Sequence, residues 1–217
     1  MPQPSVCRQG IGICREESAF GGPASEDKNP REELRKRRVI EMTSVDVIDL
    51  YTSLENLGVE IWIDGGWGVD ALLGEQTRAH KDLDITIQQN NIPMIREFLQ
   101  ALGFRDLNRD DTTSWNFVLG DENGREVDVH VIVFDERGNG MYGPPEKGEM
   151  YPAASLTGTG NIQGQRVRCI SPEWMVKFHS GYQLKEKDFR DVSALCRKFD
   201  IALPLAYQHL KERLEPS

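Results

Sequence analysis

Residues 61–87, IWIDGGWGVDALLGEQTRAHKDLDITI, constrain the fold more than any other part of the chain. The pattern predicts a strand at 60–64, a Gly-Gly turn, a short helix at 67–74 and a second strand at 82–88. Because side chains alternate along a strand, Asp82 and Asp84 project from the same face. Two carboxylates this close repel each other unless a cation lies between them. Oxygen ligands favour a hard ion, so the segment predicts a Mg2+ site.

The glycine turn adds a second prediction. A turn that opens a helix lets backbone N–H groups and the helix dipole approach a phosphate, which assigns Gly65 and Gly66 to a nucleotide. Arg78 follows in the loop before the second strand, and its guanidinium matches phosphate geometry. His80, in the same loop, is expected to orient a carboxylate. Each feature also has a plainer reading, as a tight turn, a solvated strand end or a loop arginine, but together they indicate a metal-dependent enzyme that handles a nucleotide.

A third carboxylate lies in the strand predicted at 125–134, REVDVHVIVF. Its valines alternate on one face, while Asp128 and His130 share the other. If this strand is the neighbour of the strand at 82–88, Asp82, Asp84 and Asp128 converge. Such a triad can hold divalent ions and activate a hydroxyl nucleophile. For His130, contact with a metal, with a substrate or only with a neighbouring side chain are all open.

The chain is organised in three parts: a disordered extension at 1–41, a catalytic domain at 42–170 and a C-terminal helical lobe at 171–217. The extension is rich in Pro, Gly, Ser and charge, and cannot bury enough surface to offset its ordering entropy. Our hypothesis is that folding begins near Met42 and that natural translation begins there too. The remaining predicted elements are helices at 43–57, 92–102, 172–182, 188–199 and 204–214, strands at 114–119 and 166–170, and a long loop at 135–160. We therefore predict an α+β fold with a mixed sheet.

The net charge of −9 argues against a general nucleic-acid binder, which would present a basic surface. No stretch approaches the roughly 20 apolar residues that span a membrane. The N-terminus has no apolar run of the signal-peptide type, so a cytoplasmic location is expected. The four cysteines form no metal-binding spacing, and Cys169 and Cys196 are expected to be small core residues.

The motifs GGWGVD, RAHKDLDI, EVDVHVI and VRCISPEWMVKFHSGY, with the later Asp188 and Asp191, resemble the antibiotic nucleotidyltransferases of the polymerase-beta-like superfamily. The small lincosamide nucleotidyltransferases are the nearest in pattern, followed by the aminoglycoside 2''-adenylyltransferases, and the resemblance covers about residues 45–200. It implies a five-stranded, mixed and mostly antiparallel sheet. It also implies Mg2+-dependent transfer of AMP from ATP to a drug hydroxyl, with release of pyrophosphate, and a lincosamide is the expected drug. By matching position, Gly65 and Gly66 would meet the triphosphate, Asp82 and Asp84 would bind Mg2+, and Asp128 would be both a metal ligand and the general base.

Alternative acceptors are an aminoglycoside or another small metabolite, and the non-enzyme alternative is an antitoxin-like or sensory nucleotide-binding module. The acceptor is not encoded in a readable pattern, and the oligomeric state is open, with a homodimer among the options. Tyr142, Tyr151 and Trp115 are candidates for the acceptor pocket, and His179 and Tyr182 for the lobe interface. Candidate acidic partners for the amine of an amine-bearing drug are Asp110, Asp111, Glu146 and Glu149. Lys185 and Lys187 are candidate phosphate ligands or exposed lysines, and Asp188 is explained as a helix cap.

Overall fold

The structure is a computed structural model that describes residues 41–144, 146, 148–180 and 183–214. The chain divides into two units, Met1–Val39 and Ile40–Ser217, and everything below concerns the second. The extension predicted at 1–41 therefore lies almost wholly outside the described residues, as do Tyr182, Cys7 and Cys14. The domain boundaries drawn at residues 41 and 171 stay predictions.

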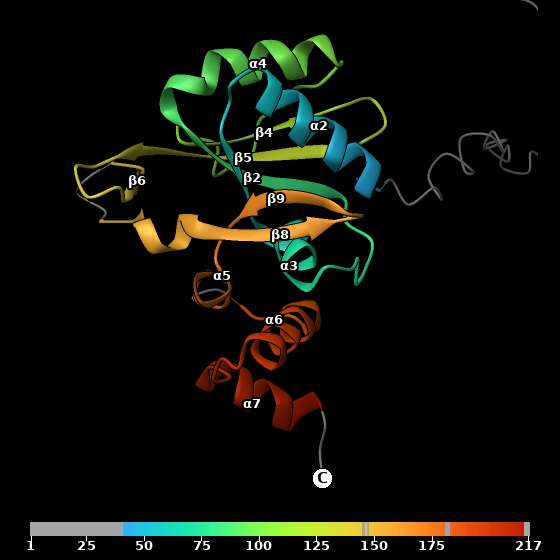
Figure 1. Ribbon diagram of the computed structural model, residues 1–217, viewed down its shortest axis with the longest axis vertical. Coiled ribbons are helices and arrows are strands. Elements are labelled where there is room, and N and C mark those ends of the chain that lie inside the picture. Colours follow the sequence, from blue (N-terminus) through green and yellow to red (C-terminus); the bar gives the residue numbers. More distant parts are fainter. Residues whose placement is uncertain (1–40, 145, 147, 181–182, 215–217) are drawn as a thin grey trace, which may run out of the picture. The chain divides into compact units, whose positions relative to one another are not determined.

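One mixed sheet organises the described chain (Figure 1). Its strands follow the order β3-β4-β5-β2-β1-β9-β8, and β6 and β7 extend it from β5. Among the described strands, β2–β5 and β1–β9 pair in parallel, and the other pairs are antiparallel. The strands are β1 (Ile61–Ile63), β2 (Asp82–Gln88), β3 (Arg105–Leu107), β4 (Asn116–Gly120), β5 (Glu126–Phe134), β6 (Gly140–Tyr142), β7 (Met150–Tyr151), β8 (Gly158–Ile162) and β9 (Gln165–Cys169).

The predicted class, α+β with a mostly antiparallel mixed sheet, is confirmed, but the predicted count of five strands is wrong. The segment at 135–160 is not one long loop, because β6, β7 and most of β8 lie in it. These strands are two to five residues long, and β6 and β8 contain Gly, so their backbone pairing leaves no alternating hydrophobic pattern to read. β3 has three exposed residues and gave no hydrophobic signal either.

Helices cover both faces of the sheet (Figure 1). Helices α2 (Ser44–Asn56) and α4 (Ile92–Ala101) lie on one side, and α3 (Gly65–Leu73) lies on the other. The C-terminal helices follow beyond α3, which contacts α5 and α6 directly. They are α5 (Pro172–Phe178), α6 (Glu186–Phe199) and α7 (Leu205–Leu214). No helix in the described part of the chain is long and apolar enough to cross a membrane.

Local sequence explains why α2 begins where it does. Thr43 is the N-cap, and its hydroxyl accepts from the N–H of Asp46 while the Asp46 carboxylate accepts from the N–H of Thr43. This capping box satisfies two N–H groups that the helix itself leaves unpaired. Residues on one stripe of α2 then bury against the sheet, among them Leu50 and Leu54.

The centre of the sheet supplies the core. Side chains from β1, β2 and β5 are buried between the helical layers, including Ile61, Ile63, Leu83, Ile85 and Val129. Cys169 and Cys196 are buried free thiols, as predicted. The apolar centre fixes β2 and β5 rigidly, so the polar residues of these two strands are held by the best-packed part of the fold.

Candidate functional site

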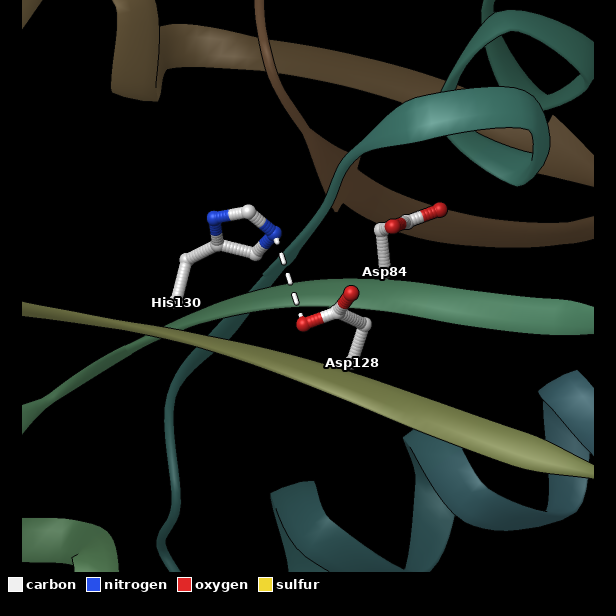
Figure 2. A group of neighbouring side chains, drawn as sticks. All are labelled: Asp84, Asp128 and His130. Atoms are coloured by element: carbon white, nitrogen blue, oxygen red, sulfur yellow. Dashed lines mark ion pairs between the residues drawn. The ribbon is translucent and has the colours of Figure 1, made fainter. Parts of the chain in front are cut away.

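The pairing of β2 with β5 brings the predicted carboxylates together. The two strands are parallel neighbours, and the register places Asp84 opposite Asp128 and Thr86 opposite His130. Residues opposite one another in a sheet point to the same face. Figure 2 shows the side chains of Asp84, Asp128 and His130 rising from that face toward a common space. The expectation that these strands are neighbours is therefore confirmed.

Asp84, Asp128 and His130 form a compact group. Each offers one ligand atom, and these atoms lie within 4.8 Å of one another. His130 Nε2 lies 3.9 Å from Asp128 Oδ1, which is buried and has no hydrogen-bond partner in the described structure. A buried carboxylate oxygen without a donor is unfavourable unless a ligand satisfies it. The group can therefore accept a cation or a proton.

Asp82 is placed differently from its predicted partners. It lies at the exposed start of β2, opposite Glu126, and is not part of the compact group. Glu126 itself is ion-paired with Lys81 and Arg109. Side-chain alternation along the strand correctly predicted the sheet face of Asp82, but it does not predict how deeply a residue is buried. Its assignment as a metal ligand remains a prediction.

The carboxylates strongly perturb one another. Burial, followed by the charges of Asp82, Asp128 and Asp64, raises the pKa of Asp84 well above its usual value, and Lys187 opposes this. Burial also raises the pKa of Asp128, with Asp82 acting in the same direction and His130 against it. A divalent cation between these oxygens would relieve the repulsion. This electrostatic pattern marks functional sites more often than structural ones.

The glycine turn is required by side-chain packing as well as by backbone geometry. Gly65 has φ +54, and a Cβ atom there would lie 2.1 Å from Asp84 Oδ2. A Cβ atom on Gly66 would lie 2.4 Å from His80 Nδ1 and 2.7 Å from Arg78 Nη2. The N–H of Gly65 is already taken, because it donates to Oδ1 of Asp64, the N-cap of α3. Phosphate binding by the turn remains a prediction and cannot use that N–H without displacing Asp64.

The loop after α3 is held by a buried polar pair. His80 Nε2 lies 2.5 Å from Asp70 Oδ2, and both side chains are about 2 % exposed. The other oxygen of Asp70 accepts from the backbone N–H and the hydroxyl of Thr77. The ring of Trp67 packs on His80 with centroids 4.8 Å apart. His80 thus pairs with a carboxylate, and the loop carrying Arg78 is fixed at both ends.

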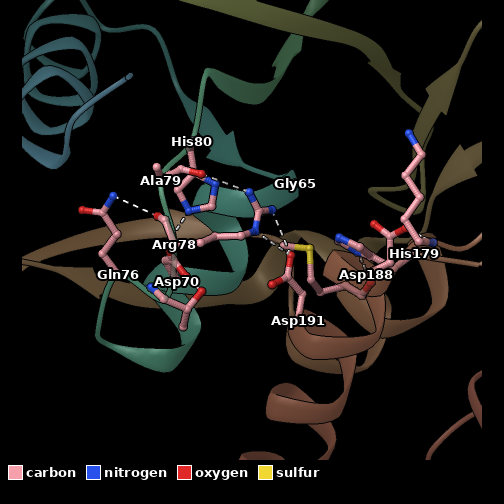
Figure 3. A network of polar contacts seen from close by, with 12 residues as sticks. Gly65, Asp70, Gln76, Arg78, Ala79, His80, His179, Asp188 and Asp191 are labelled. Atoms are coloured by element: carbon pink, nitrogen blue, oxygen red, sulfur yellow. Dashed lines mark hydrogen bonds and ion pairs between the residues drawn. The ribbon is translucent and has the colours of Figure 1, made fainter. Parts of the chain in front are cut away.

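Arg78 reaches across to the C-terminal helices. Its Nη2 and Nε lie 2.9 Å and 3.3 Å from Asp191 Oδ2 on α6, as Figure 3 shows. Asp191 is buried, whereas about a third of the Arg78 side chain is exposed. Asp188 on the same helix accepts from the N–H of Lys185, so it stabilises the helix start. The structure joins Arg78 to α6, a contact for which the sequence carries no local signal.

A cavity of about 660 Å3 opens beside the carboxylates. Asp64, Gly65, Asp84 and His130 line it together with residues in or next to β6, β7 and α5. An aromatic row runs along it: His130 stacks on Tyr142 at 5.8 Å, Tyr142 meets Tyr151 at 5.9 Å, and Tyr151 meets Phe178 at 5.0 Å. The cavity is large enough for a small molecule.

A family model described as aminoglycoside-2''-adenylyltransferase matches residues 46–195. The chain belongs to this family. It is therefore a nucleotidyltransferase of the antibiotic-modifying type, which confirms the resemblance drawn from its motifs. The matched range contains β2, β5, the glycine turn and Asp191.

Individual relatives agree with this assignment. A lincosamide resistance protein from Staphylococcus haemolyticus is 30% identical over 165 residues, covering 75% of this chain and 98% of that relative. A 2''-aminoglycoside nucleotidyltransferase from Escherichia coli is 30% identical over 140 residues, covering 63% of this chain and 73% of that relative. A crystal structure of a lincosamide antibiotic adenylyltransferase with lincomycin bound superposes with a TM-score of 0.63 at 29% identity, covering 75% of this chain and 99% of that one.

Sequence reasoning missed several residues around the candidate site. Asp64 adjoins the glycine turn and accepts from the Tyr151 hydroxyl at 3.2 Å, and the IDGG string was a signal for it. Asp70 had none, because it lies within an apolar helix. Of the four acidic residues offered to an amine, only Glu149 lines the cavity in the described structure, together with Tyr142, Tyr151 and His179.

Proposed function

We propose that the protein transfers AMP from ATP to a hydroxyl of a lincosamide, with Mg2+ held at Asp84 and Asp128. The proposal depends on the position of the cavity of about 660 Å3, called the aromatic cavity from here on, which is lined by Asp84 and His130 themselves. An acceptor in the cavity would therefore contact Asp84 and His130 directly and would lie near Asp128, which forms one compact group with them. Family membership supplies the reaction class, and the cavity supplies the choice of acceptor.

The residues present fit Mg2+. Asp84 and Asp128 offer carboxylate oxygens, the ligand type that this ion prefers, and Asp128 Oδ1 has no other partner in the described structure. An imidazole nitrogen is a poorer Mg2+ ligand, so we assign His130 to the neighbourhood of Asp128 and not to the ion. When bound, the ion neutralises phosphate charge. Asp82 lies close enough to act on both pKa values and is the third candidate ligand.

Asp128 is the proposed general base. In the transfer, the acceptor oxygen forms a bond to the α-phosphorus, the bridging oxygen leaves with pyrophosphate, and the hydroxyl proton passes to Asp128. Without the ion, burial raises the pKa of Asp128, and a bound Mg2+ would lower it, so the transfer would depend on Mg2+ acidifying the acceptor hydroxyl before Asp128 takes the proton. His130 lies 3.9 Å away and helps to orient the carboxylate. The well-packed β5 holds both residues in place.

The lining of the cavity favours a lincosamide over an aminoglycoside. A lincosamide joins a hydroxylated sugar to an alkylated amino acid with a single amine, whereas an aminoglycoside carries several ammonium groups. Among the described residues away from the carboxylates at the turn, the charged lining consists of Glu149 and Lys177, which offset each other. Tyr142, Met150 and Phe178 offer apolar surface. One amine beside Glu149 suits this balance, while a polycation would meet Lys177 without enough acidic partners.

The test is transfer to defined acceptors. The protein is incubated with ATP, Mg2+ and either lincomycin or an aminoglycoside panel, and pyrophosphate release and product mass are followed. We expect an adenylyl adduct of lincomycin and little or none of the aminoglycosides. Adducts of aminoglycosides alone would refute the choice of acceptor, and no adduct with either class would refute antibiotic modification by this protein.

A further inference from the structure

Asp64 is a buried carboxylate that contacts two separate parts of the molecule. It follows β1 directly and is the N-cap of α3, where its Oδ1 accepts from the N–H of Gly65 at 2.8 Å. Its Oδ2 accepts from the hydroxyl of Tyr151 on β7 at 3.2 Å, across 87 positions of the chain. One side chain therefore joins the glycine turn to a strand that lines the aromatic cavity.

Helix capping alone does not explain Asp64. A cap needs one side-chain oxygen, which an uncharged Asn supplies equally well, whereas both oxygens of Asp64 are engaged. The residue is only 8 % exposed, and its charge contributes to the rise in the pKa of Asp84. The carboxylate thus lies beside Asp84 in spite of an unfavourable repulsion, which indicates a role besides the start of α3.

Tyr151 is held as a donor toward Asp64. Its ring packs on Phe178 of α5 with centroids 5.0 Å apart and on Tyr142 of β6 at 5.9 Å. Burial, followed by the charge of Asp64, raises the pKa of Tyr151 well above its usual value. The phenol therefore keeps its proton and donates a hydrogen bond, and it cannot serve as a base.

The turn that Asp64 holds lies directly against Asp84. A Cβ atom on Gly65 would lie 2.1 Å from Asp84 Oδ2, so the backbone of Gly65 bounds the space of that carboxylate. The backbone N–H of Asp64 also donates to the backbone oxygen of Asp84 at 2.9 Å. A shift of the turn would therefore displace the Asp84 carboxylate. Two hydrogen bonds connect the Tyr151 hydroxyl on β7 to this contact.

We propose that Asp64 is a positioning residue through which the Tyr151 hydroxyl holds the glycine turn in place against Asp84. Tyr151 thereby serves the nucleotide side of the reaction, although it lies between the aromatic residues of the acceptor side. The inference rests on the proposed function, which assigns Mg2+ to Asp84. It extends that function because it predicts that a hydroxyl next to the acceptor affects the binding of magnesium ATP.

Tyr151→Phe is the first test, because it removes the hydroxyl and keeps the ring. Affinity for magnesium ATP is measured on the full chain by isothermal titration calorimetry without acceptor. We expect it to fall about fivefold, the usual worth of one hydrogen bond. The KM for lincomycin should stay within about twofold of the parent, because the aromatic surface is unchanged. Unchanged ATP affinity, or a rise in the KM for lincomycin alone, would overturn the proposal.

Tyr51→Phe is the matched control. The Tyr51 hydroxyl is also buried and hydrogen-bonded, since it accepts from the N–H of Arg168 at 3.1 Å, but it does not line the aromatic cavity. Both variants should lose a similar few degrees of thermal midpoint. Only Tyr151→Phe should weaken the binding of magnesium ATP. Equal weakening by Tyr51→Phe would show a general loss of stability and overturn the positioning role.

A double-mutant cycle tests whether Tyr151 acts through Asp64. Asp64→Ala removes both acceptor oxygens and should weaken the binding of magnesium ATP about tenfold. Adding Tyr151→Phe to Asp64→Ala should change the affinity by less than about twofold, because the hydroxyl has already lost its partner. Multiplied effects of the two substitutions would overturn the proposal.

Asp64→Asn is the conservative variant. It keeps an oxygen for the N–H of Gly65 and turns an amide toward the oxygen of the Tyr151 hydroxyl, so its affinity should stay within about threefold of the parent. A loss as large as that of Asp64→Ala would show that the charge matters and that the two contacts do not.

These binding measurements need no acceptor, so they separate this proposal from the proposed function. Non-multiplied effects of Asp64→Ala and Tyr151→Phe, in a protein that transfers AMP to no antibiotic, would support the positioning role and overturn the proposed function. Transfer to lincomycin together with multiplied effects would overturn the positioning role alone.

Discussion

Gly65→Ala should disable the site while leaving the fold nearly intact. The new Cβ would lie 2.1 Å from Asp84 Oδ2 and 2.6 Å from its Cγ, distances that real Cβ atoms essentially never show. To regain a contact near 3 Å, the Asp84 carboxylate has to move by about 1 Å. Misplacement of a reacting group by about 1 Å costs on the order of 100-fold in rate. We therefore expect kcat for pyrophosphate release to fall by about two orders of magnitude.

Gly58→Ala is the matched control for the backbone. Gly58 has φ +76, so alanine there meets the same left-handed strain as at Gly65, but a Cβ atom finds nothing within 4 Å. That strain costs about 1–2 kcal/mol at either position. For a domain of this size each kcal/mol lowers the thermal midpoint by roughly 2–4 °C. Both variants should melt a few degrees early, and only Gly65→Ala should lose activity.

The assay compares the two variants directly. Pyrophosphate release is measured across a Mg2+ titration with saturating ATP and lincomycin, and thermal midpoints are taken from the same preparations. Because Asp84 is displaced, Gly65→Ala should also need more Mg2+ for half-maximal rate. If Gly65→Ala turns over within about threefold of Gly58→Ala at every Mg2+ concentration, the close approach of Gly65 to Asp84 has no catalytic meaning and the reasoning is refuted.

Three further predictions concern Asp128, Tyr142 and Asp46. Asp128→Asn should still bind ATP with Mg2+, shown by calorimetry, but lose transfer; unchanged turnover would remove Asp128 from the base role. Tyr142→Ala removes the ring that stacks on His130, so the KM for lincomycin should rise several-fold with the KM for ATP unchanged, which steady-state kinetics will show. Burial raises the pKa of Asp46, but hydrogen bonds from Thr43 and the charge of Arg125 outweigh this and hold it below 3.8. The stabilisation by Asp46 is therefore present at pH values above its pKa in the unfolded state, and it is lost as the pH falls through its pKa in the folded state. Urea unfolding should show a steeper loss of stability below about pH 4 in the parent than in Asp46→Asn.

The centre of the site was predictable because it depends on short-range patterns. Alternation in the strands fixed the faces of Asp84 and Asp128, and their neighbouring positions in the sheet needed only one further assumption. The lining of the cavities was not predictable in the same way. Tyr142 and Tyr151 are brought together by strands too short to leave a pattern, and the contact of Arg78 with Asp191 joins residues 113 positions apart. Such contacts depend on how complete helices and strands pack against one another, and local residue spacing does not encode this packing.

We expect the C-terminal helices to belong to the catalytic unit, because they line part of two cavities that adjoin the glycine turn. In-line displacement needs the entering hydroxyl and the departing pyrophosphate to be held in separate places on either side of the phosphorus. The aromatic cavity adjoins the turn through Gly65 and Asp84. A second cavity of about 440 Å3, lined by Arg78, Lys187 and Arg190 among others, adjoins the turn through Arg78 beside Gly66. Helix α5 supplies part of the first lining, and α6 supplies most of the second. The strands hold Asp84 and Asp128, whereas α5 and α6 complete the lining of the two cavities beside them.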